Sequence, residues 1–158
     1  MKQFLILTLT ILSFQISIAQ KITKSHLVGE WTFIELQDQN GEKKMSIPLY
    51  RSGRYMGVEK VNRDSYILNE DGTYISFNPL DTSYGTWYVD KKTNELNLEM
   101  RIDPDFQFLS FMIKEKVVKK RRDGHYYQKP VKKKILKFSQ NTMIIADRAK
   151  YVLVYQRG

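Results

Sequence analysis

The chain has 158 residues, no cysteine and a formal net charge of +9. Without cysteine it has no disulfide, no thiol nucleophile and no lipid-modified cysteine as a membrane anchor. Its two histidines, His26 and His125, are far apart in the sequence and fit neither a metal-ligand spacing nor a nucleophile–base set. The composition therefore argues against a metal centre, a cofactor site and nucleophilic catalysis, and we expect the protein not to be an enzyme.

Residues 1–19 have the three parts of a secretory signal peptide. Lys2 supplies the positive start, an apolar stretch follows, and Ser17 and Ala19 provide the small residues of a cleavage site. The apolar stretch is interrupted by polar residues and is shorter than the roughly 20 residues that span a bilayer. We therefore expect export to the periplasm or the cell exterior, with residues 20–158 forming one domain.

Short strand-like segments follow one another along the mature chain. Residues 96–102 alternate apolar and polar side chains without exception, which is the pattern of a strand with one buried face. Residues 85–89 are rich in aromatic and β-branched side chains, and the composition of residues 90–94 predicts a hairpin turn between the two strands. Further strands are expected at residues 66–68, 73–77, 106–122, 125–138, 142–146 and 151–155.

Four places depart from simple alternation. The apolar residues of 31–36 change parity after Phe33, which predicts a bulge or a bend. Pro130 predicts a bulge or an edge within the strand that contains it. Residues 42–55 have no clean period and are expected to form a loop or lid with at most one short strand, and residues 22–28 are expected to form a single helical turn.

These segments make a meander of eight or nine strands without a repeat, a linker or a long amphipathic helix. Such a meander must pack as two sheets or close on itself, because open strand edges invite aggregation. The predicted fold class is all-β, a single antiparallel up-and-down β-barrel. A barrel of about eight strands is either filled by side chains or holds one small ligand.

Four sequence elements occur in a fixed order: Gly29-Glu30-Trp31, residues 69–74, Gly85-Thr86-Trp87 and residues 135–157. In this order they resemble the lipocalin-like domains of small exported proteins from Bacteroidetes, within the lipocalin superfamily. The resemblance implies that Gly29 and Trp31 lie at the closed end of the barrel and that Arg157 covers the indole, as a structural cation–π contact. A Thr-Asp-Tyr motif on a middle loop is missing, which favours the looser lipocalin-like group over the ligand-carrying core lipocalins.

A small apolar or amphiphilic molecule is the ligand that such a barrel implies, and aromatic walls suit flat or lipid-like molecules. The residues expected in the barrel interior and in contact with this ligand are Tyr55, Tyr74, Trp87, Leu98, Met100, Phe108 and Phe111. Core filling explains the aromatic residues equally well, since strands favour them in any case. The sequence leaves a hollow and a filled interior open.

The positive charge is concentrated in residues 114–137, which contain eleven Lys or Arg residues and only two acidic residues, Glu115 and Asp123. We expect a long basic hairpin that contacts an anionic lipid or glycan surface through Lys119, Lys120, Arg121, Arg122, Lys132, Lys133 and Lys134. Export argues against nucleic acid as the partner, although neighbouring tyrosines would supply stacking surfaces. The alternative is a solvated hairpin whose lysines only prevent strand-to-strand aggregation.

Asp103 and Asp105, on either side of Pro104, are the strongest candidate for paired carboxylate chemistry. Asp-Pro-Asp is also ordinary turn composition, and we expect a turn. Two functions therefore remain from the sequence. The first is a binding protein that takes a small ligand into the barrel mouth, and the second is a non-catalytic interaction module that uses residues 114–137.

Overall fold

Strands dominate the part of the chain that the computed structural model describes, residues 21–148 and 150–158. The predicted signal peptide, residues 1–19, lies outside these described residues. The barrel strands are β1 (Gly29–Asp38), β5 (Ser65–Leu68), β6 (Thr73–Phe77), β7 (Thr82–Asp90), β8 (Glu95–Ile102), β11 (Val131–Phe138), β12 (Thr142–Asp147) and β13 (Tyr151–Arg157).

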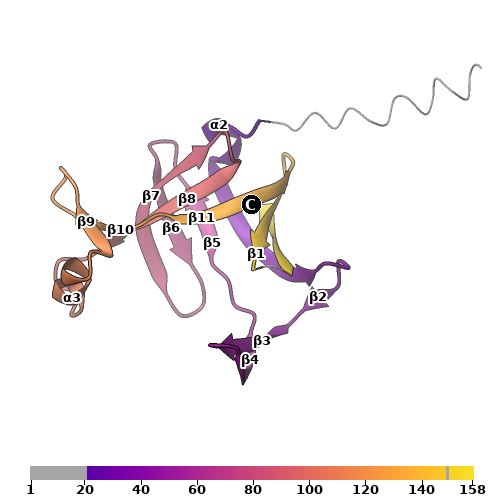
Figure 1. Cartoon of the computed structure of the whole chain (residues 1–158). Helices are drawn as coiled ribbons and strands as arrows, with labels where there is room; N and C mark the ends of the chain where they lie inside the picture. The colour runs from indigo at the N-terminus through magenta and orange to yellow at the C-terminus, as the bar shows by residue number, and fades with distance from the viewer. Residues whose placement is uncertain (1–20, 149) are drawn as a thin grey trace, which may run out of the picture.

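These eight strands form a closed antiparallel barrel (Figure 1). The order around it is β11-β12-β13-β1-β5-β6-β7-β8, and β8 pairs back with β11. Closure gives each of these strands a partner on both sides, which removes open edges from the barrel wall. The predicted fold class, an all-β single antiparallel barrel, is confirmed.

The two ends of the barrel differ in what they carry. At the closed end, the helical turn α2 (Lys24–Leu27) precedes β1, and the connections between barrel strands are short. At the open end the chain makes two long excursions, which project from the barrel at the bottom and at the left of Figure 1. The predicted helical turn within residues 22–28 is confirmed by α2.

The first excursion joins β1 to β5 and contains β2 (Lys43–Lys44) and a separate two-stranded sheet, β3 (Ser46–Arg51) and β4 (Arg54–Lys60), here called the β3–β4 hairpin. The second joins β8 to β11. It comprises residues 103–130, here called the side arm, and holds α3 (Leu109–Lys114), β9 (Val118–Lys120) and β10 (Tyr126–Gln128). In the side arm β10 pairs with the open-end part of β8.

Several local predictions are confirmed. Gly72 turns β5 into β6 with a φ of 90°, and Gly124 turns β9 into β10 with a φ of 85°. A register shift between Phe33 and Glu35 is the bulge that the change of parity predicted. Pro130 separates β10 from β11 and therefore interrupts the expected strand.

Two predicted segments are wrong. Residues 42–55, expected to be a loop or lid with at most one short strand, form β2, β3 and the start of β4. Residues 106–122, expected to be one extended stretch, contain the helix α3. Apolar side chains at Leu109, Met112 and Ile113 follow helical spacing, so one helix turn can bury Leu109 against the arm.

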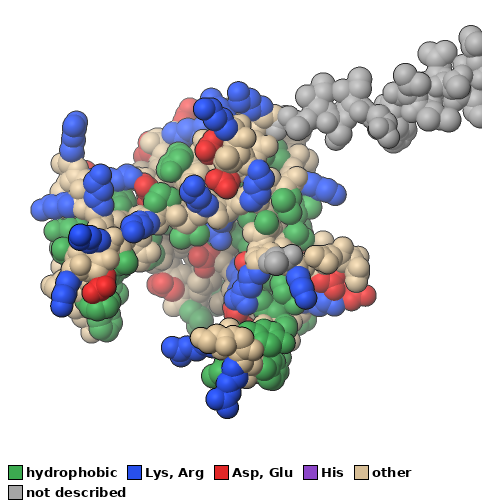
Figure 2. Space-filling model, in the orientation of Figure 1, with side chains coloured by type: hydrophobic (Ala, Val, Ile, Leu, Met, Phe, Trp, Pro, Cys, Tyr) green, Lys and Arg blue, Asp and Glu red, His purple; other side chains and the backbone are tan. Residues whose placement is uncertain are grey.

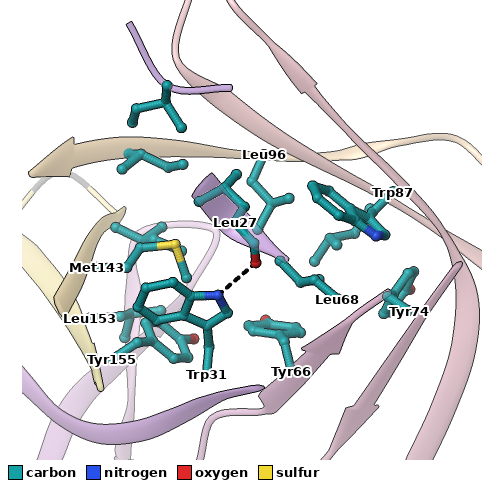
Figure 3. Packing of buried hydrophobic residues seen from close by; sticks show 14 of the residues in the cluster. Leu27, Trp31, Tyr66, Leu68, Tyr74, Trp87, Leu96, Met143, Leu153 and Tyr155 are labelled. Atoms are coloured by element: carbon teal, nitrogen blue, oxygen red, sulfur yellow. Dashed lines mark hydrogen bonds between the residues drawn. The ribbon is translucent and has the colours of Figure 1, made fainter. Parts of the chain in front are cut away.

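Buried side chains converge in the barrel interior (Figure 3). The labelled members of this cluster are Leu27, Trp31, Tyr66, Leu68, Tyr74, Trp87, Leu96, Met143, Leu153 and Tyr155. Trp31 is 0% exposed, and its Nε1 donates a hydrogen bond to the Leu27 carbonyl at 2.8 Å. Burial of one such side chain contributes about 3 kcal/mol, so Trp31 fixes α2 to the barrel floor.

Arg157 lies over this floor from the last strand. Its guanidinium carbon is 4.5 Å from the Trp31 ring centroid. The same group donates hydrogen bonds to the carbonyls of Val28 at 2.7 Å and His26 at 2.6 Å. Gly29 has a φ of 128°, and a Cβ there would lie 2.8 Å from Arg157 Nη1. Gly29, Trp31 and Arg157 therefore meet at the closed end, where the resemblance places them.

Candidate binding surfaces at the open end

The barrel interior also contains polar groups, those of Tyr66, Tyr155 and Lys133. The rings of Tyr66 and Tyr155 are 5.6 Å apart, and Lys133 Nζ lies 6.0 Å from the Tyr66 ring centroid. Burial lowers the pKa of Lys133 and raises the pKa of both tyrosine hydroxyls. The predicted place of Lys133 on an outer basic surface is wrong. Alternate residues of β11 face opposite sides of the wall, and Lys133 lies on the inner side.

The seven residues expected in the barrel interior lie in three different places. Tyr74, Trp87 and Leu98 are buried in the core cluster. Tyr55 is 56% exposed on β4, so its expected interior position is wrong: β4 belongs to the projecting hairpin and not to the wall. The remaining three, Met100, Phe108 and Phe111, line a groove at the rim of the open end.

This groove, here called the aromatic groove, has a volume of about 540 Å³ and lies between the ends of β7 and β8 and helix α3. Its apolar lining consists of Tyr84, Met100, Ile102, Phe106, Phe108, Phe111 and Met112. Phe108 is 55% exposed and Phe111 is 62% exposed, so the expected interior position is wrong for both. Because α3 buries Leu109, its opposite face turns Phe111 outward, and Phe108 lies just before the helix.

A second groove, here called the basic groove, has a volume of about 920 Å³ and lies between the outer face of β8 and the β9–β10 part of the side arm. Its cationic lining consists of Lys116, Lys119, Lys120, Arg121, Arg122 and Lys129. Glu99 and Asp123 are the acidic residues in this lining. Gln128 lines both grooves, which are therefore adjacent.

Arg121 differs from the other cations of the basic groove. It forms an ion pair with Glu99 on β8 and donates to Thr86 Oγ1 at 3.1 Å. Its guanidinium carbon also lies 4.4 Å from the ring centroid of Tyr127, whose hydroxyl donates to Asp123 at 2.8 Å. These contacts attach the side arm to the barrel wall, so Arg121 has structural partners although it is exposed. Lys119, Lys120 and Arg122 are exposed as well, and none of them forms an ion pair within the described residues.

The single basic hairpin expected over residues 114–137 is wrong, because the segment divides at Pro130. Lys132 and Lys134 belong to β11 in the barrel wall. Lys132 lies 3.9 Å from Glu95 as an ion pair, and Lys134 donates to the Thr93 carbonyl. Their side chains therefore contact the connection at the closed end and do not join the basic groove.

Positive charge gathers at the open end as a whole. The four segments at this end, residues 39–64, 78–81, 103–130 and 148–150, hold fifteen Lys or Arg and eight Asp or Glu residues. Figure 2 shows Lys and Arg side chains spread over the side arm, at the left of the view, beside apolar side chains at its lower tip. Such a concentration attracts anions over a distance of about 8 Å at physiological salt.

The other sequence candidates for chemistry do not converge. His26 Nδ1 accepts a hydrogen bond from the Thr23 backbone at 3.3 Å, and its ring stacks on Phe138. The Asp103 carbonyl accepts a hydrogen bond from the Phe106 backbone, as in a turn. Among residues 21–148 and 150–158, no group of three or more His, Asp or Glu side chains is placed to hold a metal ion. No helix in the same residues is long and apolar enough to cross a bilayer.

Sequence reasoning missed several residues of these grooves. Lys116 and Lys129 flank the predicted cations and belong to the basic groove, and Tyr84 and Phe106 belong to the aromatic groove. A signal was present in residues 106–113, where aromatic and aliphatic side chains outnumber what one face of a strand can bury.

The closed eight-stranded antiparallel barrel with an arginine over its opening tryptophan is the lipocalin-like fold that the sequence resemblance implies. The chain is similar to a lipocalin-like protein from Bacteroides uniformis, with 13% identity, a TM-score of 0.46, and coverage of 84% of this chain and 99% of that chain. It is also similar to an uncharacterized protein from Bacteroides eggerthii, with 14% identity, a TM-score of 0.46, and coverage of 83% and 98%. No family model and no curated protein matches the chain.

Proposed function

We propose that this protein is a non-catalytic, exported binding module that contacts an anionic lipid surface through the side arm. The observation that carries the proposal is the adjacency of the two grooves on one excursion of the chain. The basic groove presents exposed lysines and an arginine, and the aromatic groove presents Phe108 and Phe111 beside them. An anionic head group and an apolar interior occur side by side at a lipid surface and match this arrangement.

The expected strength of this contact follows from the number of free cations. Each Lys or Arg near an anionic bilayer contributes about 1 kcal/mol. Lys119, Lys120 and Arg122 together would then contribute about 3 kcal/mol, a factor of roughly 100 in affinity. The aromatic side chains add apolar burial at the head-group level, where such rings are enriched in membrane proteins.

The exposed phenylalanines favour lipid over the other anionic partners. A glycan or a nucleic acid would engage the cations and could stack on Tyr126, which has Lys120 Nζ 5.7 Å from its ring centroid. Neither partner accounts for Phe111 and Ile113, which are exposed on α3 in the same side arm. Lipid accounts for both kinds of side chain.

Packing inside the barrel favours this proposal over a ligand in the closed half. Tyr74, Trp87 and Leu98 are engaged in the core, and Trp87 Nε1 donates to the Asn69 carbonyl at 3.0 Å. Both grooves described above lie at the rim or on the outer wall.

Sedimentation with phosphatidylglycerol vesicles tests the proposal. We expect the wild type to bind these vesicles and not phosphatidylcholine vesicles, with the binding lost at high salt. The variant Lys119→Gln/Lys120→Gln/Arg122→Gln should bind roughly 100-fold more weakly. A matched control removes three exposed cations from β11, with the substitutions Lys132→Gln, Lys134→Gln and Lys137→Gln, and should change binding less than threefold.

Two outcomes would contradict the proposal. The first is equal weakening by both triple variants, which would indicate nonspecific attraction by net charge. The second is absence of vesicle binding together with a co-purifying small molecule, seen by native mass spectrometry, that both triple variants retain. That result would favour a ligand inside the barrel.

A further inference from the structure

We infer that the β3–β4 hairpin is a second contact with the same anionic lipid surface, so that the barrel rests on the membrane by its open end. The inference rests on the proposed function of the side arm. It concerns the β3–β4 hairpin, which is separate from the side arm in the sequence and forms no strand pair with it.

The β3–β4 hairpin exposes large apolar side chains on a sheet of only two strands. Tyr50 is 61% exposed and Val58 is 67% exposed. Further exposed apolar residues in or beside the hairpin are Met45, Leu49, Tyr55 and Met56. Ile47, near the hairpin base, is buried in the barrel core cluster, so the hairpin is anchored at its base while its tip projects.

The tip combines aromatic rings with cations. Tyr50 and Tyr55 are cross-strand partners whose ring centroids are 5.7 Å apart, and the pair Arg51 and Arg54 follows at the turn. Tyrosine and arginine beside apolar side chains are the composition of segments that lie at the head-group level of a bilayer. The two arginines complement an anionic leaflet, and this charge complementarity is why we assign a lipid surface to the hairpin.

The connectivity of the barrel places the hairpin and the side arm at the same end. The hairpin lies between the end of β1 and the start of β5, and the side arm lies between the end of β8 and the start of β11. Leu80, which is 87% exposed in the turn between β6 and β7, lies at this end as well. Figures 1 and 2 show the two excursions as separate projections, the hairpin at the bottom and the side arm at the left.

Two separate contacts from one barrel bind a surface more tightly than one contact alone. Once the side arm is bound, the hairpin meets the surface at a high effective concentration, so a weak second contact adds to the affinity. The pair also restricts the tilt of the barrel to rotation about the line that joins the two contacts.

Fluorescence of a new tryptophan at the hairpin tip tests the inference. The native Trp31 and Trp87 are buried and supply a constant background. In the variant Tyr55→Trp we expect a blue shift on phosphatidylglycerol vesicles and quenching by brominated phosphatidylglycerol. The control is Tyr88→Trp at a 46% exposed aromatic position on the outer wall of β7, which should show neither effect.

A second measurement removes the apolar contact. The variant Met56→Ser/Val58→Ser should bind phosphatidylglycerol vesicles roughly tenfold more weakly, since it deletes apolar area from the hairpin. The control pair, Val131→Ser and Leu136→Ser, removes two apolar side chains of similar exposure from β11 and should change binding less than twofold. Urea unfolding of each variant verifies that the barrel is intact.

The outcomes separate this inference from the proposed function. If the wild type binds no vesicles, the proposed function fails. If it binds and depends on the side-arm cations, while the tryptophan at position 55 stays unquenched and both serine pairs behave alike, the inference alone is overturned. A lipid-free dimer in light scattering that Met56→Ser/Val58→Ser abolishes would also overturn it, by showing that a second copy covers the hairpin.

Discussion

At the closed end of the barrel a partly buried arginine lies over a fully buried tryptophan, whereas at the open end lysines and arginines stand beside phenylalanine and tyrosine rings that face outward. Both ends combine cations with aromatic rings, and the surroundings of these side chains differ. Arg157 donates to carbonyls of Val28, His26 and Gln140. Lys119 and Arg122 are exposed on the side arm. Cations with protein partners stabilise the fold, and cations without them are available to a ligand.

This comparison predicts that substitutions at the two ends affect different properties. Changes in the wall and at the closed end should lower the free energy of unfolding. Changes in the side arm and in the β3–β4 hairpin should lower lipid binding and leave the free energy of unfolding within about 1 kcal/mol of the wild type.

The largest effect is expected at Gly85 in β7. A Cβ there would lie 2.1 Å from the Glu99 carbonyl oxygen and 2.7 Å from Tyr74 Cε1. Gly85→Val should therefore separate β7 from β8 and lower the free energy of unfolding by about 4 kcal/mol or more, measured by urea denaturation. Gly124→Ala is the open-end control. It meets no atom within 4 Å and should cost only about 1 kcal/mol for its positive φ. Equal losses would contradict the comparison.

A smaller effect is expected at Arg157. Arg157→Met keeps the apolar stem over Trp31 and removes the cation–π contact and the hydrogen bonds to the carbonyls of Val28, His26 and Gln140. Some of these carbonyls regain water, so we expect a loss of about 3 kcal/mol in the free energy of unfolding. Arg122→Met at the open end should change it by less than about 0.5 kcal/mol. If Arg157→Met lowers the free energy of unfolding by less than about 1 kcal/mol, Arg157 does not have the structural role described here.

The smallest effect of a single substitution is expected at an interior tyrosine, and it depends on pH. Burial raises the pKa of Tyr66 and Tyr155, and raises the pKa of Tyr74 to about 12. Unfolded tyrosines lose their protons near pH 10, while the folded ones keep them. The stability that these groups contribute is therefore complete below pH 10 and falls as pH rises above it, by about 1.4 kcal/mol per tyrosine for each pH unit.

Tyr155→Phe tests this interior directly. The Tyr155 hydroxyl is buried near the Tyr66 hydroxyl, and within residues 21–148 and 150–158 it makes no hydrogen bond of ordinary geometry. Its removal should raise the free energy of unfolding at pH 8 by about 1 kcal/mol and reduce the loss between pH 8 and pH 11 by about 1.4 kcal/mol. Tyr50→Phe at the exposed hairpin tip should alter neither value. A destabilised Tyr155→Phe at pH 8 would show that the hydroxyl has a partner, such as bound water.

Alternation was sufficient to predict the barrel wall. In β8 the apolar side chains of Leu96, Leu98 and Ile102 are buried on one face. Glu99 and Arg101 on the other face are more exposed, so the period of two survives in the sequence. The bulge in β1 could be predicted as well, because a bulge shifts the phase of burial at Phe33 and leaves a readable change of parity.

The open end could not be predicted in the same way. The β3–β4 hairpin exposes apolar side chains on both strands, so no alternation marks it as a sheet. Residues 106–122 were misassigned because exposed aromatic residues are frequent in strands as well as on a short helix such as α3. Lys133 was placed outside because a charged residue is rarely buried, yet its position on β11 turns it inward beside Tyr66.

The pairing of β1 with β13 has a consequence for how the chain acquires its structure. Arg157 and Val28, which this pairing brings together, are 129 residues apart in the sequence. Until β13 arrives, β1 and β12 each present a bare edge, and the indole of Trp31 lacks its cover. Contacts of such long range make folding slow, on the order of milliseconds to seconds. The barrel therefore closes only after β13, the last strand of the chain, has been synthesised.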